Sequence, residues 1–329
     1  MKAVTLAVSL WLPFSFSVAS AQLTKVPVGY SAIAAAALPA WMAKESGIFR
    51  NNGLDVQLVY FRAGTTATMA LLSRQTPISQ VAGPAIVSAS LRGGDAVMIA
   101  GGVVVTEFWL MTRPDIKTAE QLKGGSVAIA LFGGLGDFMT RIALKRLGLT
   151  PVKDVAIVQI GGNPERLSAL ETGRVQATML PQPDNFMAQK RGFYNLMSVR
   201  LPYQATGVAT TRTFIRESPD VVRRYVKSQV EAIHRIKTDR ETTIRVLAKY
   251  HGLQDKEILE RSYDEFSTDE TLPPKQYPTL EGIKNILEPL AQTDVKAKAA
   301  KPEDFVDVRF IKELDESGFI DQLYKAGKR

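Results

Sequence analysis

The sequence predicts an α/β fold in which strands and helices alternate. Short apolar runs with the period-two alternation of strands recur at regular intervals, and helical segments lie between them. Glycine follows several of these segments, for example Gly47 and Gly93, where helices are expected to end. A strand, helix, strand rhythm of this kind builds a mostly parallel sheet that is covered by helices.

The first part of the chain predicts four strands with connecting helices. Val26, Val28 and Tyr30 alternate as in a strand, and the following stretch carries Leu38, Trp41 and Met42 at helical spacing. The remaining strands of this part are predicted at residues 54–60, 78–82 and 96–100. One helix is predicted at residues 67–72, and another follows a turn at Gly83 and Pro84 and ends near Gly93.

A second, similar passage begins after Pro114. A strand at residues 126–130 precedes the glycine cluster Gly133, Gly134 and Gly136, and a helix follows. The elements expected after that cluster are a helix at 137–147, a strand at 155–160, a helix at 164–172 and a strand at 176–180.

From Ser218 onward the pattern is almost wholly helical. Ser218 is expected to cap a long helix whose first residue is Pro219 and whose first turn carries Asp220. The apolar stripe of this helix consists of Val222, Tyr225, Val226, Val230 and Ile233.

The N-terminal residues predict a cleavable export signal. Lys2 precedes an apolar run at residues 3–16, which is too short to span a bilayer, and small residues including Ala19 and Ala21 follow. Cleavage is expected after Ala21. Together with the absence of cysteine for a lipid anchor or a disulfide, this predicts a soluble, monomeric protein of the periplasm.

The charge balance is a mild basic excess. Lys and Arg number 41 against 33 Asp and Glu, for a formal net charge of +8. The excess could steer anionic solutes, but basic residues such as Arg223, Arg224 and Lys227 are scattered along helices, as on an ordinary solvated surface. A basic stripe with interleaved aromatic residues is missing, so no nucleic-acid partner is expected.

The sequence resembles the solute-binding proteins of ABC transporters, in the group that binds aliphatic sulfonates, nitrate and thiamine precursors. The resemblance rests on the residues at 26–30, 41–56, 122–128, 148–155, 166–177 and 302–307 and covers nearly the whole chain after residue 21. It implies the type-two periplasmic-binding-protein fold, with two lobes joined by two crossover strands near residues 110–113 and 207–211. Lobe one would comprise residues 22–111 plus 212–329, and lobe two residues 112–211.

The resemblance also implies a function. The protein would clasp a small organic solute between its lobes by hinge closure and deliver it to an ABC permease and ATPase of the inner membrane. An anionic, sulfonate- or carboxylate-like solute is expected. A pyrimidine or other thiamine precursor, and a ligand-sensing role, are alternatives that use the same cleft.

Candidate binding residues lie just after the predicted strands. In an open parallel sheet the ligand binds at the carboxyl ends of the strands, where helix N-termini present unpaired N–H groups. The candidates are Tyr30, Ser31, Gly64, Thr65, Thr66, Gly83 and Pro84 in lobe one, and Phe132, Gly133, Gly134, Asp137, Gly162, Asn163, Pro181, Gln182 and Asp184 in lobe two.

Several of these residues also have a structural explanation. Gly64, Gly83 and Gly133 suit tight turns as well as a binding site. Thr65 and Thr66 suit helix capping, and Asp137 suits a helix N-terminus.

Glu107 and Trp109 are further candidates near the expected first crossover. The indole of Trp109 would stack on a flat solute or belong to the core, whereas Trp41 is expected in the core. Glu107 would bind an amino group or, as we expect, turn away from the ligand and pair with an arginine such as Arg141 or Arg212.

Enzymatic functions find little support in the sequence. Only two histidines occur, His234 and His251, and neither has cysteine, histidine or paired acidic residues at metal-binding spacing. A Gly-x-Ser-x-Gly nucleophile motif and a phosphate-binding loop are both missing. The fungal pyrimidine synthase that shares the scaffold carries a cysteine-rich motif, which this chain lacks. We therefore expect no catalysis, no metal and no cofactor.

Overall fold

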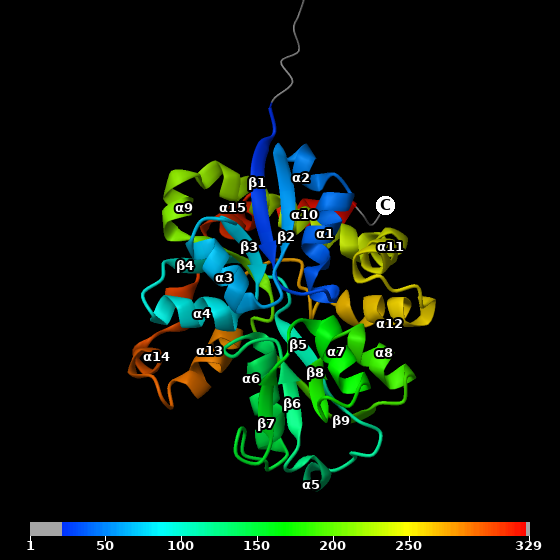
Figure 1. Ribbon diagram of the computed structural model, residues 1–329. Helices are drawn as coiled ribbons and strands as arrows, with labels where there is room; N and C mark the ends of the chain where they lie inside the picture. Colours follow the sequence, from blue (N-terminus) through cyan, green and yellow to red (C-terminus); the bar gives the residue numbers. More distant parts are fainter. Residues whose placement is uncertain (1–21, 327–329) are drawn as a thin grey trace, which may run out of the picture.

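The structure is a computed structural model that describes residues 22–326 (Figure 1). The expected signal segment and its cleavage after Ala21 lie outside the described residues. Among residues 22–326, no helix is both long and apolar enough to cross a bilayer. The described chain forms two lobes, one above the other in Figure 1, and each is built around its own five-stranded sheet.

The first sheet, in the upper lobe, has the order β2-β1-β3-β10-β4. Its strands are β1 (Thr24–Tyr30), β2 (Leu54–Tyr60), β3 (Ile78–Val81), β4 (Ala96–Ala100) and β10 (Gly207–Thr211). Strands β2, β1 and β3 are parallel, and β10 is antiparallel to both of its neighbours. The helices and 3-10 turn between these strands are η1 (Ala35–Ala37), α1 (Leu38–Glu45), α2 (Ile48–Asn51), α3 (Gly64–Leu72) and α4 (Gly83–Leu91).

The second sheet, in the lower lobe, has the order β7-β6-β8-β5-β9. Its strands are β5 (Val105–Thr112), β6 (Ser126–Ile129), β7 (Ala156–Gln159), β8 (Ala177–Leu180) and β9 (Tyr194–Pro202). Strands β7, β6 and β8 are parallel, whereas β5 runs antiparallel to β8 and β9. The helices of this lobe are α5 (Ala119–Leu122), α6 (Leu135–Arg146), α7 (Asn163–Glu171) and α8 (Asp184–Lys190).

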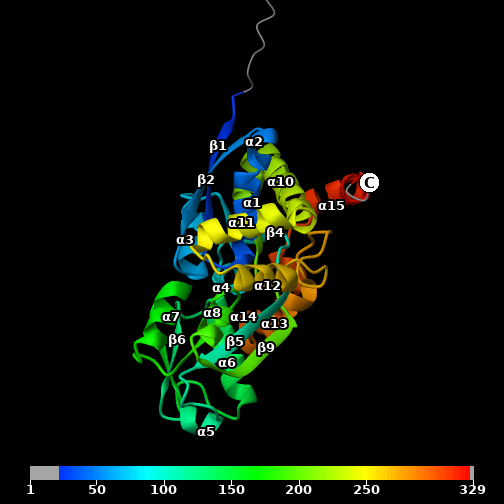
Figure 2. The ribbon, with the colours of Figure 1, turned by 90° about the vertical axis from the view of Figure 1, so that its right-hand side faces the viewer.

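The C-terminal third is helical, as predicted from Ser218 onward. Its elements are α9 (Arg212–Glu217), α10 (Pro219–Thr238), α11 (Arg240–His251), α12 (Lys256–Phe266), α13 (Leu280–Leu290), α14 (Val295–Ala299), η2 (Pro302–Phe305), α15 (Arg309–Glu316) and α16 (Phe319–Ala326). Figure 2 shows α3 on one side of β1 and β2, and α1 with α10 on the other. All five residues of the predicted stripe on α10 are buried. Ser218 occupies the N-cap position, but its side chain makes no capping hydrogen bond.

The chain passes between the lobes at places other than those expected. It leaves the first sheet after Ala100 and enters the second at Val105, and it returns between Pro202 and Gly207. Residues 110–113 instead lie in or just after β5, and residues 207–211 form β10. The glycine pair Gly101 and Gly102 directly follows β4, so the first crossover lies before the expected boundary at residue 111. We therefore propose residues 22–100 and 207–326 as lobe one and 105–202 as lobe two.

The two crossovers are hydrogen-bonded to each other. The Tyr203 amide donates to the Val104 carbonyl at 2.8 Å, and the Ala205 amide donates to the Val103 carbonyl at 3.0 Å. The Val103 amide also donates to the Thr206 hydroxyl at 3.3 Å. Because both connections are held together here, this pair of segments is the structural joint between the lobes.

Candidate functional site

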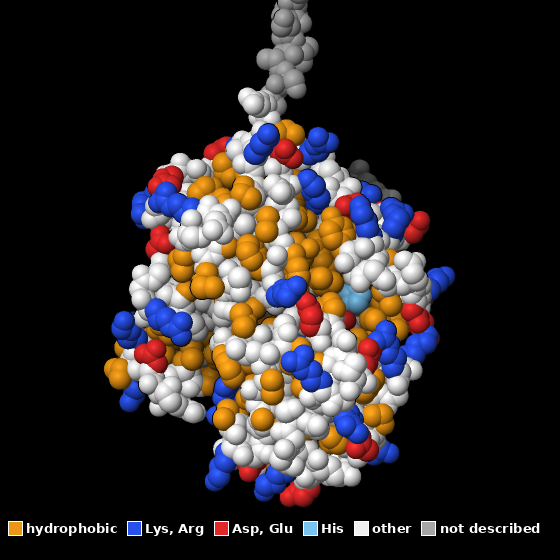
Figure 3. All heavy atoms as spheres, viewed as in Figure 1, with side chains coloured by type: hydrophobic (Ala, Val, Ile, Leu, Met, Phe, Trp, Pro, Cys, Tyr) orange, Lys and Arg blue, Asp and Glu red, His pale blue; other side chains and the backbone are white. Residues whose placement is uncertain are grey.

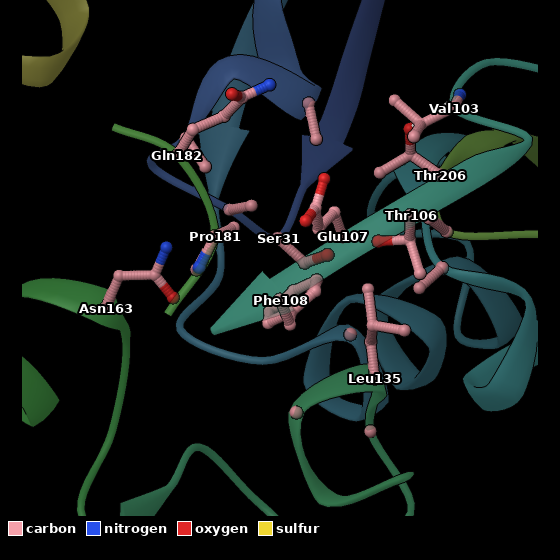
Figure 4. Close-up of a pocket in the computed structure, with 18 of the residues that line it drawn as sticks. Ser31, Val103, Thr106, Glu107, Phe108, Leu135, Asn163, Pro181, Gln182 and Thr206 are labelled. Atoms are coloured by element: carbon pink, nitrogen blue, oxygen red, sulfur yellow. Dashed lines mark hydrogen bonds between the residues drawn. The ribbon is translucent and has the colours of Figure 1, made fainter. Parts of the chain in front are cut away.

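A cavity of about 480 Å³ lies between the two sheets. Its wall combines Ser31, Gly64 and Ala85 from lobe one with residues of lobe two, and Val103 and Thr206 of the crossovers contribute as well. Figure 4 shows Ser31, Val103 and Thr206 around a common space with residues of lobe two such as Phe108 and Leu135. A cavity of this size accommodates a small organic molecule.

About half of the candidate residues, from strand ends and from the expected first crossover, line this cavity. These are Ser31, Gly64, Glu107, Trp109, Gly134, Gly162, Asn163, Pro181 and Gln182. Ser31 follows β1, Gly134 follows β6 and Pro181 follows β8, so the carboxyl ends of strands from both sheets do converge on one place. Whether these residues contact a ligand remains a prediction.

The other candidates lie outside the cavity wall. They are Tyr30, Thr65, Thr66, Gly83, Pro84, Phe132, Gly133, Asp137 and Asp184. Gly83 is buried in the first turn of α4, where an added Cβ would come within 2.8 Å of Ile286 and 2.9 Å of Gln204. Tyr30 packs against the rings of Trp41 and Tyr60.

Asp137 has the helix N-terminal role that its sequence position suggested. Its carboxylate accepts a hydrogen bond from the Gly133 amide at 2.9 Å and from Arg141 Nε at 2.7 Å. The aromatic ring of exposed Phe132 lies 6.0 Å from the same arginine. This cluster stabilises the start of α6 beside the cavity wall.

Gly133 offers a direct check of this assignment. Its φ of +76° is left-handed, and an added Cβ would meet no atom within 4 Å. We expect Gly133→Ala to lower the free energy of unfolding by about 1–2 kcal/mol through backbone strain, with solute affinity unchanged. Denaturant unfolding and calorimetric titration measure the two effects. Lost affinity at unchanged stability would instead make Gly133 a binding residue.

Glu107 pairs with an arginine, as expected, but the partner and the orientation differ from the prediction. Its carboxylate lies 3.6 Å from Arg200, its cross-strand neighbour on β9, and Arg200 also pairs with Glu270 at 2.6 Å. Arg141 and Arg212 have other partners. Glu107 lines the cavity and is not turned away from it (Figure 4). Burial raises the pKa of Glu107, although Arg200 opposes the rise.

Trp109 and Trp41 differ in position. Trp109 is largely buried, packs beside Phe186 and lines the cavity, so it serves the core and the cavity wall together. Trp41 is fully buried and stacks on Tyr250 at a ring separation of 4.8 Å. The expected core role of Trp41 is confirmed.

The cavity wall also contains an arginine that is not among the candidate residues predicted from the sequence. Arg166, one turn into α7, is 3% exposed and lines the cavity. Burial lowers its pKa to about 10, and Asp184 is the main opposing charge. Arg166 therefore stays protonated at neutral pH. Tyr60 and Arg62, at the end of β2, were also missed, although the strand-end rule applies to them.

Other residues that line the cavity were not predicted, because no local sequence pattern indicates their position. Thr106 and Phe108 belong to β5, which was not predicted as a strand. Thr268 and Thr271 follow α12, far along the sequence from the rest of the wall, and Arg261 and Glu265 lie on α12 itself. Only the packing of the C-terminal helices against the lobes brings them to the cavity.

Side chains from the two lobes meet beside the cavity. His251 Nε2 of α11 lies 3.1 Å from Asp184 Oδ1 of α8, and both side chains are nearly inaccessible. Arg62 lies 3.5 Å from Glu165, and the Arg261 guanidinium lies 4.0 Å from the Phe186 ring centroid. These contacts hold the lobes against each other on one side of the cavity.

The surface of the described residues carries charged side chains of both signs (Figure 3). Figure 3 shows basic and acidic side chains interspersed over the face of the described residues that it presents. Within residues 22–326, no cluster of three or more His, Cys, Asp or Glu side chains is arranged to hold a metal ion.

Comparison with known proteins assigns a family and a fold. The model of the NMT1-like family matches residues 19–251. The putative binding protein YtlA of Bacillus subtilis (strain 168) is 22% identical over 236 residues, which cover 68% of this chain and 70% of YtlA.

Solved structures share the fold. The periplasmic nitrate-binding protein NrtA from Synechocystis PCC 6803 superposes with a TM-score of 0.74 at 15% identity, covering 90% of this chain and 89% of its own. The periplasmic aliphatic sulphonate binding protein SsuA from Escherichia coli gives 0.63 at 20% identity, covering 87% and 96%. The predicted α/β fold of periplasmic binding proteins is therefore confirmed.

Proposed function

Since this chain belongs to the NMT1-like family, we propose that it is the extracytoplasmic solute-binding component of an ABC importer. It encloses a small organic anion between its lobes and catalyses no reaction. The observation that carries the proposal is the cavity of about 480 Å³, whose wall is shared by both sheets and both crossovers.

The wall supports an anionic solute. The first residues of three helices line it, namely Gly64 of α3, Leu135 of α6 and Asn163 of α7. Helix N-termini carry unpaired N–H groups and the positive end of the helix dipole, which together favour anions. Two proteins with this fold carry names that refer to anions, sulphonate and nitrate.

Binding proceeds by hinge closure in this proposal. A cavity closed by both lobes has to open for a solute to enter, and the paired crossovers are the segments about which the lobes would rotate. Contacts such as His251 with Asp184 then form on closure and exclude water from the solute. The closed form docks on a membrane permease that is powered by an ATPase, outside the cytoplasm.

A thermal-shift screen tests the proposal. The purified protein is heated with sulfonates, nitrate, aliphatic and aromatic carboxylates, and pyrimidines. A true solute at a hundredfold excess over its dissociation constant stabilises the folded protein by about 2.7 kcal/mol. Stabilisation by an organic anion supports the proposal. Stabilisation only by cationic or amine-bearing compounds would contradict the anionic class.

Glu107 gives a second test of the solute's charge. Its carboxylate in the cavity wall repels an anion, so we expect Glu107→Gln to leave anion affinity unchanged or to raise it. Because burial raises the pKa of Glu107, lowering the pH toward that pKa should also strengthen anion binding in the parent protein but not in the variant. Calorimetric titrations over a pH series measure both effects. A loss beyond about tenfold, or about 1.4 kcal/mol, would favour an amine-bearing solute.

A further inference from the structure

The guanidinium of Arg166 is held in place but is not fully paired. Its Nη1 donates to the Met179 carbonyl at 2.7 Å and to the Thr178 hydroxyl at 3.3 Å. Its Nη2 donates to the Asn163 side-chain oxygen. Its Nε is buried and has no hydrogen-bond partner among the described residues. An unpaired buried N–H on a charged group is costly, so a missing acceptor is expected there.

The unpaired Nε–H lies on the edge of the guanidinium that can bind a carboxylate through two parallel hydrogen bonds. Nε–H and one N–H of Nη2 point in the same direction from a planar guanidinium, and this edge matches the two coplanar oxygens of a carboxylate. Arg166 lines the cavity, and its neighbour Asn163 begins α7, so the helix N-terminus contributes at the same point. Gly136, which also lines the cavity, lies on the Nη1 side of the guanidinium, where an added Cβ would be 3.7 Å from Nη1.

A chain of buried side chains fixes the arginine and leaves Nε–H and one N–H of Nη2 without a partner among the described residues. Asn163 Nδ2 donates to Asp184 Oδ2 at 3.0 Å, and Asp184 Oδ1 meets His251 of lobe one at 3.1 Å. Asp184 therefore balances part of the Arg166 charge through Asn163, not by a direct ion pair. The arginine stays charged and keeps donors free for a solute.

The rest of the cavity differs in character from the Arg166 end. Phe108, Trp109 and Leu135 provide an apolar middle section. Beyond it, on the other side of β5 from β8, Glu107 pairs with Arg200 of β9, and Glu270 approaches the same arginine. Figure 4 shows Asn163 and Pro181 on one side of Phe108 and Thr106 with Thr206 on the other. Two carboxylates share a single arginine at this far end, which disfavours a second negative charge on the solute.

We infer that Arg166 binds the acid group of the solute and that the preferred solute is a monocarboxylate with an apolar body and an uncharged far end. This inference rests on the proposed function and specifies the solute class of the same cavity. Arg166 acts as the specificity-determining residue, and Asn163 and Asp184 position it.

Two matched series of compounds test the inference by calorimetric titration of the purified protein. One series is benzoate, benzenesulfonate, benzamide and terephthalate, and the other is hexanoate, hexanesulfonate, hexanamide and adipate. We expect the monocarboxylate of at least one series to bind about tenfold or more tightly than its sulfonate, amide and dicarboxylate. Tightest binding of a sulfonate, an amide or a dicarboxylate would overturn the inference.

Variants of Arg166 tie the preference to this residue. Arg166→Gln should lower affinity for the preferred carboxylate by about tenfold or more while leaving affinity for the amide unchanged. Arg166→Lys keeps the charge but loses the paired edge, so it should reduce the carboxylate preference over the sulfonate, and it serves if the glutamine variant does not fold. Arg174→Gln, an exposed arginine just beyond α7, is the matched control and should bind as the parent does.

Failure of the inference about Arg166 and failure of the proposed function would give different results. An unchanged carboxylate-to-amide ratio in both Arg166 variants would overturn the role of Arg166 while leaving the proposed function intact. Failure of every compound in both series to bind would overturn the proposed function for organic anions, and this inference with it.

Discussion

Trp41→Ala is expected to lower the free energy of unfolding by about 3–5 kcal/mol, the range for removing a buried large aromatic side chain. Trp41 is fully buried, its ring stacks on Tyr250, and its edge meets Tyr30 at a centroid separation of 6.0 Å. The side chain joins α1 to α11 and to β1, so its loss leaves a cavity where three elements meet. Denaturant unfolding of the parent and variant measures the change.

Trp41→Phe is the matched control for this prediction. It keeps an aromatic ring in the same place, so we expect a smaller loss of stability than for alanine. Both variants should bind solute as the parent does under conditions where they are folded, because Trp41 lies outside the cavity wall. Normal stability combined with lost solute binding would show that Trp41 belongs to the site and not to the core.

Gly102→Val is expected to weaken both stability and solute affinity. A Cβ at residue 102 would lie 2.9 Å from the Thr206 carbonyl oxygen and 3.2 Å from its carbonyl carbon, on the opposite crossover. Backbone atoms cannot rotate away as a side chain does, so the two crossovers have to separate. Overpacking of this kind costs about 1–3 kcal/mol. Because Val103 and Thr206 line the cavity, the same shift alters its wall.

The effect of Gly102→Val on solute affinity tests whether the contact between the two crossovers sets the geometry of the closed cavity. We expect a loss of affinity of about tenfold or more for the solute found in the screen, and a smaller loss for Gly102→Ala. Titration calorimetry and denaturant unfolding give the two values for each variant. Parent-like affinity in a destabilised valine variant would mean that the contact between the crossovers does not set the closed geometry.

Much of the fold could be predicted because it follows from local patterns. The strands at residues 54–60 and 96–100 were predicted with the bounds that the structure has, since strict alternation or a short apolar run is flanked by glycine or helix signals. The long helix from Pro219 was also predicted, because proline at its first position and its apolar stripe are both local features.

The antiparallel strands could not be predicted in the same way. Strand β5 was taken for a crossover, and β9 and β10 were not assigned, because their positions depend on pairing with strands far away in sequence. Glu107 pairs across the sheet with Arg200, 93 positions later, and no local pattern reports such a register. The same limitation moved the expected lobe boundaries away from Gly101 and Gly102.

The candidate site likewise contains residues that local sequence patterns predicted and residues that they did not. Ser31, Gly134 and Asn163 were found because the ends of parallel strands meet at one edge of a sheet. Arg166 was missed because it lies one turn into a helix and reaches the cavity through its long side chain. Thr271 was missed because the C-terminal helices bring it to the cavity only in the folded protein.

Hydrogen exchange with and without a bound solute tests the central claim, that a solute is enclosed between the lobes, most directly. The proposal predicts slower amide exchange on both sides of the cavity, at residues 31–36 and 205–206 and at residues 131–136 and 162–163. Surfaces far from the cavity, such as α5 and α14, should exchange as before. Slowed exchange in one lobe alone, or only at residues outside the cavity wall, would contradict the account.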